Sequence, residues 1–324
     1  MATSEFELIR RYFTDLGKQR QWLSVGIGDD AAVITPPAGQ QLLISIDTLN
    51  VGIHFPAQSS AKDIGHKALA VNLSDIAAMG GEPQWFTLAL SLPSADEAWL
   101  SLFCQGLAEL VEQYQLCLVG GDTTRGPLSI TIQIAGAIPT EQALTRAGAN
   151  VGDDIYVTGT LGDAAAGLLV CENQLHADET TTRYFLNRLN RPEPRVAIGL
   201  GLRGIATACI DVSDGLAADL GHIIDDSGVG AELRMETLPV SGQLRAQGLA
   251  EARLQELNLF GGDDYELCFT AAPPQRAAIA QLAQTTAVPI TLIGTVIAEK
   301  GLFALEHAQR ASLPAKGFDH FQNE

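Results

Sequence analysis

Aspartates recur in this sequence where apolar segments end, a placement that lets carboxylates from several segments bind one divalent metal ion. They are Asp29 and Asp30 in GIGDDAAV, Asp47 after LLISI, Asp122 after LVGG, and Asp211 and Asp214 in IDVSDG. Any one of them alone is also typical of a turn or a helix cap, which aspartate favours. Hard oxygen ligands with neither His nor Cys among them suit Mg²⁺, Mn²⁺ or Ca²⁺ and do not suit zinc.

Asp75 is a further candidate, because it interrupts the apolar stripe of a predicted helix. The stripe consists of Ile64, Ala68, Val71, Asp75 and Met79, at spacings of four, three, four and four residues. Helical periodicity places these residues on the face that is expected to be buried, with Lys67 and Ser74 on other faces. A buried carboxylate without a partner costs several kcal/mol, so Asp75 needs a metal ion, an arginine or backbone donors.

The elements that must position these residues mix helices and strands. The first half predicts helices over 5–17, 60–81 and 95–115, and strands over 41–52, 85–93, 117–122 and 127–138. The composition changes at 147–154, and a second series of strands and helices follows over 154–171, 210–228, 260–270 and 289–297. Two α/β domains are therefore the economical interpretation.

If the strand ends converge, six or more carboxylates share one site. The carboxyl ends of strands form the ligand crevice in open α/β sheets. Two carboxylates about 4 Å apart repel by roughly 4 kcal/mol at an effective dielectric constant near 20, so the cluster needs counter-ions. Because Mg²⁺ takes few carboxylates per ion and adds phosphate oxygens, the pattern predicts several ions and a polyphosphate ligand.

The composition indicates a globular protein of the cytoplasm. The chain has 324 residues, of which 46% are hydrophobic and 18% charged, and no apolar run is long enough for a membrane span. The start of the chain lacks the layout of a signal peptide, and the five scattered cysteines are typical of core thiols in a reducing compartment. A net charge of −18 argues against nucleic acid as a partner but allows a phosphorylated ligand bound through cations.

Seven ordered motifs along nearly the whole chain resemble those of the thiamine-monophosphate kinase family. They are GIGDDAAV (26–33), DTLNVGIHF (47–55), NLSDIAAMGG (72–81), GGDTT (120–124), DVSDG (211–215), GGDDYEL (261–267) and GFDHF (317–321). The resemblance implies transfer of the ATP γ-phosphoryl group to thiamine monophosphate, giving thiamine diphosphate and ADP. One departure is Asp263, where the family pattern has glutamate.

The resemblance also implies a fold, which the family shares with aminoimidazole ribonucleotide synthetase and selenophosphate synthetase. It is an α/β fold (α+β mixed) in two domains. Residues 1–148 are expected to bind ATP and Mg²⁺ and to form a homodimer by packing mixed sheets into a barrel. Residues 149–324 are expected to form an α/β domain. The expected ligands are several Mg²⁺ ions, ATP and thiamine monophosphate.

The family's functional positions can be placed on this sequence residue by residue. The metal positions correspond to Asp30, Ser45, Asp47, Asp75, Asp122, Asp211 and Asp214, among which Asp30, Asp75 and Asp211 are assigned the catalytic role. The nucleotide contacts correspond to Gly121, Asp122, Arg146 and Ser213. The contacts to the phosphorylated vitamin correspond to His54, Glu266 and an aromatic that is either Phe318 or Phe321.

Other functions are compatible with the same carboxylates. A metal-dependent phosphohydrolase would use them to activate water, and another ATP-using synthetase of the superfamily would share the architecture. An acidic Ca²⁺-binding dimer is a non-enzymatic alternative, although the chain lacks a loop of the EF-hand type. No Walker-type G-x-x-x-x-G-K-[ST] motif is present, so metal ions would take over the role of its lysine.

Overall fold

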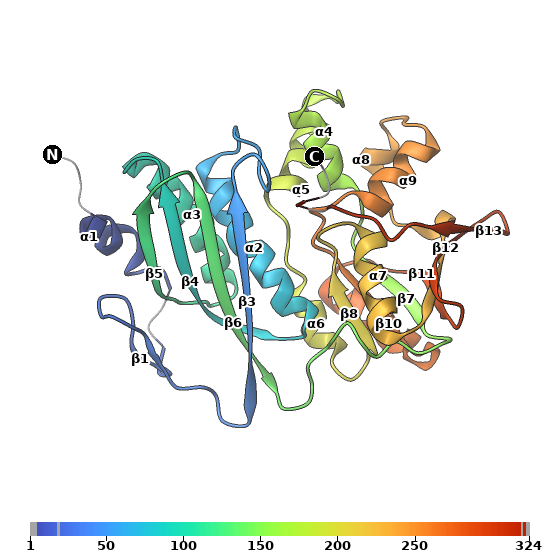
Figure 1. Cartoon of the computed structure of the whole chain (residues 1–324), viewed down its shortest axis with the longest axis horizontal. Helices are drawn as coiled ribbons and strands as arrows, with labels where there is room; N and C mark the ends of the chain where they lie inside the picture. Colours follow the sequence, from blue (N-terminus) through green and yellow to red (C-terminus); the bar gives the residue numbers. More distant parts are fainter. Residues whose placement is uncertain (1–4, 18–19, 319, 322–324) are drawn as a thin grey trace. The chain divides into compact units, whose positions relative to one another are not determined.

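The chain forms two units in the computed structural model, which describes residues 5–17, 20–318 and 320–321 (Figure 1). Unit 1 consists of Met1–Ile76 and Gly81–Glu141, and unit 2 consists of Ala77–Gly80 and Gln142–Glu324. Each unit has its own sheet and its own helices. Within the described residues, no helix is long and apolar enough to cross a membrane.

Unit 1 is built on a four-stranded sheet in the order β3-β6-β4-β5. The strands are β3 (Gln40–Asn50), β4 (Glu82–Leu92), β5 (Leu118–Arg125) and β6 (Ser129–Pro139). The β3–β6 and β4–β6 pairs are antiparallel, whereas β4 and β5 run parallel and are connected through a helix. The two edges of this sheet are therefore β3 and β5, each of which carries predicted site residues.

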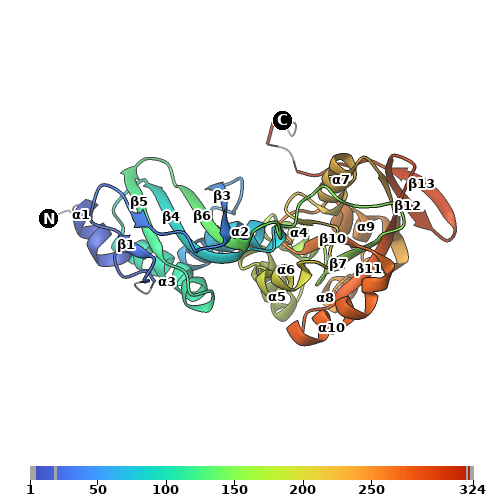
Figure 2. The same ribbon diagram turned by 90° about the horizontal axis from the view of Figure 1, so that it is seen from below.

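Helices α2 (Ala61–Ala78) and α3 (Glu97–Gln113) cover one face of this sheet (Figures 1 and 2). Alternate residues of β6, Ile130, Ile132 and Ile134, are fully buried, as expected for side chains that point toward the helices. The helices approach closely because Gly106 lacks a side chain: a Cβ there would lie 1.9 Å from the Lys62 carbonyl oxygen.

The other face of the unit 1 sheet exposes apolar side chains. Leu42, Ile44 and Ile46 alternate along β3, and Ile44 and Ile46 are each 61% exposed. The described helices of the unit lie on the opposite face (Figure 2). The remaining elements of the unit are α1 (Glu5–Leu8), a π-helical turn η1 (Ile9–Phe13), β1 (Leu23–Val25) and β2 (Val33–Ile34).

Unit 2 is built on a seven-stranded sheet in the order β13-β12-β9-β11-β7-β10-β8. The strands are β7 (Asp154–Thr158), β8 (Ala208–Asp211), β9 (Gly230–Arg234), β10 (Leu267–Ala271), β11 (Ile290–Ile297), β12 (Gly301–Glu306) and β13 (Gln309–Leu313). Every residue of β7, β8 and β10 is buried, and these strands read as continuous apolar runs because both of their faces are covered.

Helices pack around the unit 2 sheet (Figure 1). They are α4 (Asp163–Cys171), α5 (Glu179–Asn190), α6 (Val196–Leu202), α7 (Leu216–Ser227), α8 (Gly242–Arg245), α9 (Glu251–Phe260) and α10 (Arg276–Thr286), with short 3₁₀ turns η2 (Met235–Thr237) and η3 (Pro273–Gln275). Leu216, Leu220 and Ile223 of α7 are fully buried in the main apolar cluster of the unit. This burial fixes α7, which begins directly after the predicted DVSDG motif.

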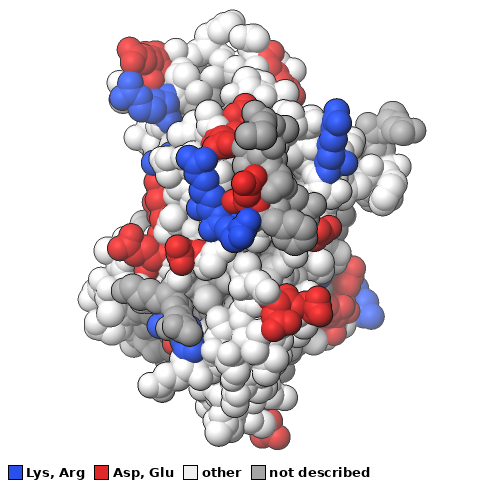
Figure 3. Space-filling view, turned by 90° about the vertical axis from the view of Figure 1, so that its left-hand side faces the viewer, with Lys and Arg blue, Asp and Glu red and all other residues white. Residues whose placement is uncertain are grey.

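Charged side chains are interspersed on the surface. On the face shown in Figure 3, basic side chains lie beside acidic ones among the described residues and do not form a continuous basic patch. The Arg11 guanidinium, for example, is paired with the Glu97 carboxylate.

Candidate active site

Ser45 and Asp47 of β3 project from the same face of the unit 1 sheet and lie next to α2. They are two residues apart in an extended strand, so their side chains share a face, and both are half-buried. The Ser45 hydroxyl donates a hydrogen bond to Asp75 Oδ2 at 2.5 Å. Three of the predicted metal ligands therefore belong to one face of the unit.

Helix α2 is buried on nearly all of its sides, which corrects the expectation of a single buried stripe. Lys67 is only 1% exposed, and Asn72 and Ser74 are completely buried, whereas Asp75 is half-buried. The helix is covered by the sheet on one side and by α3 on another, so apolar periodicity does not distinguish its faces. The prediction that Asp75 occupies the buried face and Lys67 another face was wrong in this respect.

Lys67 supports the turn that carries His54. Its ammonium group donates a hydrogen bond to the His54 carbonyl oxygen at 2.9 Å. The backbone N–H of Asn50 donates to His54 Nδ1 at 3.0 Å, so a neutral imidazole carries its proton on Nε2. Sequence reasoning missed this contact of Lys67, because nothing in the sequence distinguishes it from an ordinary helix lysine.

Asp29 and Asp30 lie in the connection between β1 and β2, and both are exposed. The Asp30 backbone N–H donates to Asp29 Oδ1 at 2.9 Å, so Asp29 stabilises the turn itself. The two acids of the motif thus differ: one has a local structural role, and the side chain of the other stands at the surface.

Asp122 lies on the edge strand opposite to Asp47. Asp122 pairs with Ala89, Ala89 pairs with Thr131, and Thr131 pairs with Thr48. Paired residues share a face and neighbours along a strand alternate, so Asp122 lies on the face of Thr48 and Asp47 lies on the opposite face. Three strand spacings separate the two edges, roughly 14 Å at about 4.8 Å per strand. Gly121 precedes it with φ +159°, and a Cβ at that position would lie 2.0 Å from the Leu88 carbonyl oxygen.

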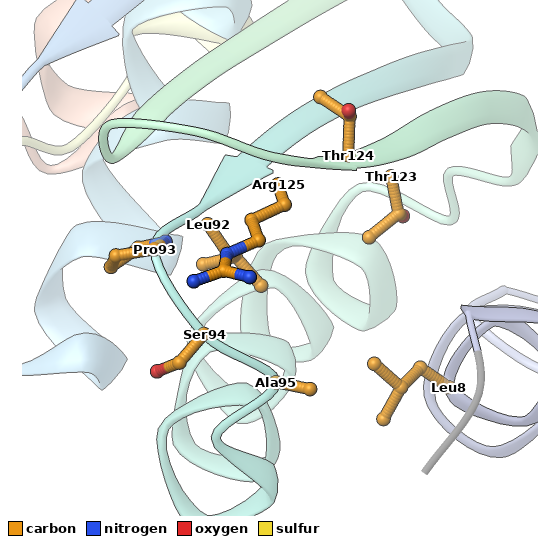
Figure 4. A pocket seen from close by; sticks show the side chains of 8 residues that line it. All are labelled: Leu8, Leu92, Pro93, Ser94, Ala95, Thr123, Thr124 and Arg125. Carbon is orange, nitrogen blue, oxygen red and sulfur yellow. The ribbon is translucent and has the colours of Figure 1, made fainter. Parts of the chain in front are cut away.

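A cavity of about 490 Å³ opens beside this end of β5 (Figure 4). It is lined by Leu8, Leu92, Pro93, Ser94, Ala95, Thr123, Thr124 and Arg125. Thr123 also lines a smaller hollow that includes Gly121 and Asp122, so a ligand held at Asp122 borders on the larger space.

Within the described part of the chain, no group of three or more His, Cys, Asp or Glu side chains is close enough together to hold a metal ion. Five of the predicted metal ligands belong to unit 1 and two, Asp211 and Asp214, to unit 2.

In unit 2, two chain segments bind the backbone of residues 211–215, here called the DVSDG loop. The backbone N–H of Asp263 donates to the Ser213 carbonyl oxygen, and that of Tyr265 donates to the Val212 carbonyl oxygen, both at 2.8 Å. The Phe318 N–H donates to the Asp214 carbonyl oxygen at 3.1 Å. The GGDDYEL and GFDHF motifs, far apart in sequence, therefore meet at this loop.

Helix α7 is not capped by the DVSDG side chains, although Ser213 and Asp214 are typical capping residues. Its N-cap is Gly215, which makes no side-chain capping bond. Instead, Asp219 Oδ2 accepts backbone N–H groups from Ser213, Asp214 and Gly215 at 3.0, 3.1 and 3.2 Å. Burial, together with the charges of Asp211 and Asp214, raises the pKa of Asp219 to about 8.

Glu266 is 1% exposed and is held by two arginines. Arg195 donates to both of its carboxylate oxygens at 2.6 Å, and Arg188 donates to Oε1 at 3.0 Å. The Thr158 hydroxyl donates to Oε2 at 2.6 Å. Burial alone would raise the pKa of Glu266, but the hydrogen bonds and charge of the arginines outweigh it and lower the pKa.

The segment before Glu266 is strained. Asp263 has φ +68° and Tyr265 has φ +49°, in the left-handed region that non-glycine residues rarely adopt. Asp264, between them, is buried and accepts the Gly162 N–H at 2.8 Å. Burial raises the pKa of Asp264 to about 8. Strain of this kind persists only where the surroundings impose it, and it is concentrated at functional sites.

Arg146 is exposed and lies close to the DVSDG loop. Ser227, the last residue of α7, accepts the N–H groups of Gly148 and Ala149 at 3.1 Å, which fixes the segment that follows Arg146. Burial raises the pKa of Asp214, and the positive charge of Arg146 is among the opposing effects that lower it. Arg146 and Asp214 are thus near enough for their charges to interact.

Two family descriptions match the chain. "AIR synthase related protein, N-terminal domain" matches residues 28–138, and "AIR synthase related protein, C-terminal domain" matches residues 150–305. The thiamine-monophosphate kinase of Escherichia coli is 47% identical over 323 residues, covering 99% of both chains. The enzyme of that name from Haemophilus influenzae is 40% identical, also over 99% of both chains.

The chain belongs to the thiamine-monophosphate kinase family.

Solved structures agree with this assignment. The thiamine-monophosphate kinase of Stenotrophomonas maltophilia superimposes with a TM-score of 0.87 at 48% identity, covering 94% of this chain and 97% of that one. A structure described as AaThiL complexed with AMPPCP and TMP gives a TM-score of 0.78 at 33% identity, covering 91% and 92%. The predicted two-domain mixed α/β fold of the aminoimidazole ribonucleotide synthetase type is confirmed.

The positions that thiamine-monophosphate kinases suggest for vitamin binding differ in accessibility here. Phe318 is 45% exposed and is bonded to the DVSDG loop through its backbone, whereas Phe321 is 93% exposed. Glu266 is enclosed by its arginines, so its direct contact with a ligand stays a prediction. Asp263 is half-buried and is the accessible acid of the GGDDYEL motif.

Proposed function

We propose that this chain transfers the γ-phosphoryl group of ATP to thiamine monophosphate, forming thiamine diphosphate and ADP. The observation that carries the proposal is 47% identity over 99% of both chains with a thiamine-monophosphate kinase. The relative complexed with AMPPCP and TMP supports ATP and thiamine monophosphate as the two substrates. The cavity beside Asp122 and the converging loops of unit 2 supply accessible polar surface for such ligands.

The reaction needs positioning more than acid–base chemistry. An oxygen of the vitamin's phosphate attacks the γ-phosphorus, the bond between that phosphorus and the β–γ bridging oxygen breaks, and ADP leaves with the bond electrons. A phosphate monoester has a second pKa of about 6, so the nucleophile is already ionised at neutral pH and no general base is required. The protein must bring two polyanions together in line.

The donor set fits Mg²⁺ by its chemistry, because the candidate ligands offer only oxygen and Ser45 already lies 2.5 Å from the Asp75 carboxylate. We assign metal binding to Asp30, Ser45, Asp47, Asp75, Asp122, Asp211 and Asp214, with the catalytic role at Asp30, Asp75 and Asp211. When bound, Mg²⁺ would shield the repulsion between the phosphates and stabilise charge on the transferring group.

We assign the organic parts of the substrates to residues around these carboxylates. Gly121, Asp122, Arg146 and Ser213 are proposed to contact ATP; the missing Cβ of Gly121 and the exposed guanidinium of Arg146 suit phosphate oxygens. His54 and Phe318 are proposed to contact the vitamin, with Phe321 as the second aromatic candidate. Glu266 is proposed to act on the vitamin site through the GGDDYEL backbone, which it anchors.

We further propose that the protein works as a homodimer in which two unit 1 sheets close into a barrel. The exposed row of Leu42, Ile44 and Ile46 needs an apolar partner, and a second sheet of the same kind is self-complementary. Asp47 and Asp122 lie on opposite edges of one sheet, so closure would bring β3 of one copy toward β5 of the other. Closure would therefore bring together the two edge strands that carry these acids.

The division of labour follows the sequence prediction. Residues 1–148 are proposed to bind ATP and Mg²⁺ and to dimerise, and residues 149–324 to complete the site with the DVSDG and GGDDYEL motifs. The five cysteines are all free thiols, which suits a reducing cytoplasm.

Phosphorus NMR of the purified protein with ATP, Mg²⁺ and thiamine monophosphate tests the proposal. Resonances of thiamine diphosphate that appear together with ADP are expected. Inorganic phosphate in their place would indicate a phosphohydrolase, and AMP or an acceptor other than thiamine monophosphate would indicate another ATP-using enzyme of the superfamily. Either result would refute the proposed kinase.

A further inference from the structure

The backbone of the DVSDG loop is bound through both its N–H and its carbonyl groups, whereas the side chains of Ser213 and Asp214 stay half-buried. Its N–H groups at Ser213, Asp214 and Gly215 all point to one carboxylate oxygen, Asp219 Oδ2, at 3.0–3.2 Å. Successive N–H groups that converge in this way form an anion-binding nest. The carboxyl group that occupies this nest belongs to the protein itself and comes from the first turn of α7, where Asp219 is 3% exposed.

The carbonyl groups of the same loop are also engaged. Val212 and Ser213 accept N–H groups from the GGDDYEL segment, and Asp214 accepts the N–H of Phe318. The backbone of the loop is thereby fixed on both sides, by Asp219 through its donors and by two other motifs through its acceptors. Loss of the Asp219 carboxyl group would therefore be expected to shift the loop backbone and, with it, the carboxylates of Asp211 and Asp214.

The role of Asp219 follows from the way in which helix α7 begins. In many helices, a Ser or Asp that precedes the first turn spends its side-chain oxygen on an N–H of that turn. Here Asp219 binds the N–H groups of the three residues that precede the helix, and Gly215 at the N-cap has no side chain to offer. The Ser213 and Asp214 side chains therefore do not serve as the N-cap of α7.

We propose that Asp219 is a positioning residue for metal and nucleotide binding: it fixes the DVSDG loop so that the carboxylates of Asp211 and Asp214 and the Ser213 hydroxyl are held in place before a ligand arrives. The inference rests on the proposed function of this loop. Asp219 itself contacts neither metal nor substrate, and it acts through the loop. Outer partners that orient metal ligands typically change metal affinity by 10–100-fold when they are removed.

The test replaces Asp219 with alanine and uses Asp225→Asn as the matched control, because Asp225 is an exposed aspartate on the same helix. Hydrogen exchange by mass spectrometry follows the amides of 213–215, and electron paramagnetic resonance measures Mn²⁺ binding in the presence of AMPPCP. In Asp219→Ala, amide exchange is expected to be at least about tenfold faster, and Mn²⁺ affinity at least about tenfold weaker. The control is expected to match the wild type in both.

Steady-state kinetics add a readout that a purely structural role would not move. The Mg²⁺ concentration for half-maximal rate should rise by about tenfold or more in Asp219→Ala, while kcat at saturating Mg²⁺ falls by less than about threefold. Faster exchange with unchanged Mn²⁺ and Mg²⁺ dependence would overturn the proposal and leave Asp219 as a helix cap only.

A second variant covers the case in which alanine does not fold. Asp219→Glu keeps the buried carboxylate and displaces it by one methylene, so weaker Mn²⁺ binding is expected there too. If the Asp219→Glu protein folds and shows altered amide exchange but binds Mn²⁺ with wild-type affinity, the proposal is refuted. Mn²⁺ binding requires no turnover, which separates the two hypotheses. A wild-type protein that binds Mn²⁺ but transfers no phosphate would refute only the kinase, and one that binds no Mn²⁺ would refute the positioning role.

Discussion

The two units hold their candidate site residues in place in different ways. In unit 2, the DVSDG loop is bonded through its backbone to Asp219, to the GGDDYEL segment and to Phe318. In unit 1, the candidate acids are spread over a strand connection, two sheet edges and a helix, and Asp30 and Asp122 are exposed. The difference is that the backbone of the unit 2 loop is fixed by contacts within the unit, whereas the unit 1 acids are proposed to come together with ligands or a second copy.

The largest expected effect tests unit 1 at the contact between Ser45 and Asp75. Asp75→Asn removes a charge beside Ser45, and it is expected to lower kcat by at least about 100-fold, since the transferring phosphate loses its metal support. Asp30→Asn should act similarly. Asp63→Asn on the same helix is the control and should keep the rate within about twofold. Retained activity in both Asp75→Asn and Asp30→Asn would contradict a metal cluster at these acids.

Mixing two inactive variants sharpens the assembly argument. Asp47→Asn and Asp122→Asn are each expected to be inactive, because each removes one acid from every site. If a site takes Asp47 from one copy and Asp122 from the other, random mixing restores roughly a quarter of the wild-type activity, since half of the dimers then contain one intact site of two. Activity is measured after unfolding and refolding the mixture. No recovery would place both acids in the same copy's site.

The strongest preorganising contact in unit 2 is the buried ion pair of Glu266. Arg195→Met removes the bidentate hydrogen bonds to the Glu266 carboxylate. The substitution should lower the free energy of unfolding, measured by urea denaturation, by about 3–5 kcal/mol. The double variant with Glu266→Gln should be less destabilised than the sum of the single variants, because it leaves no unpaired charge. Additive losses would show that the pair is not coupled.

Substitution of the two C-terminal phenylalanines is expected to have a smaller effect, on the KM for thiamine monophosphate. Phe318 is anchored at the Asp214 carbonyl, whereas Phe321 is almost fully exposed, so Phe318→Ala should raise the KM for thiamine monophosphate by about tenfold through lost stacking. Phe321→Ala is the matched comparison and should change that KM by less than about twofold. The reverse order would assign the vitamin contact to Phe321.

The smallest expected effect concerns pH. Asp264 has a pKa raised to about 8 in the folded protein, so the folded state retains a proton that the unfolded state has lost above about pH 4. The contribution of this group to stability therefore falls as pH rises from about 4 to about 8. In EDTA, Asp264→Asn should lose less stability than the wild type between pH 5 and 8, as measured by urea midpoints. Parallel profiles would contradict the raised pKa.

Much of the fold could be predicted because its signals are local. The strand over 127–138 and the helix over 95–115 correspond to β6 (Ser129–Pro139) and α3 (Glu97–Gln113), whose periodicities reflect one buried face each. Helical periodicity did not predict burial correctly for α2. This helix is buried on nearly all sides, so its apolar stripe predicted the wrong face for Asp75. Burial by two neighbours is a tertiary property that a single helical pattern does not contain.

Candidate site residues could be predicted where they end a motif and could not be predicted where they only support one. Asp211 and Asp214 stand out after an apolar strand, whereas Asp219 and Lys67 look like ordinary helix residues in the sequence. Asp219 accepts hydrogen bonds from the loop directly before its own helix, and Lys67 donates one to the backbone of the turn that carries His54. Neither contact is marked by a motif in the sequence. The same holds for Glu266, whose partners Arg188 and Arg195 are 78 and 71 residues away.

The most direct test of the central claim, direct in-line transfer from ATP to thiamine monophosphate, is stereochemical. ATP made chiral at the γ-phosphorus with oxygen isotopes is incubated with the protein, Mg²⁺ and thiamine monophosphate, and the product's configuration is determined by phosphorus NMR. One in-line displacement predicts thiamine diphosphate with inverted configuration. Retention would indicate two displacements through a phosphorylated enzyme group, and it would contradict a site in which the carboxylates hold metal ions and take no phosphate themselves.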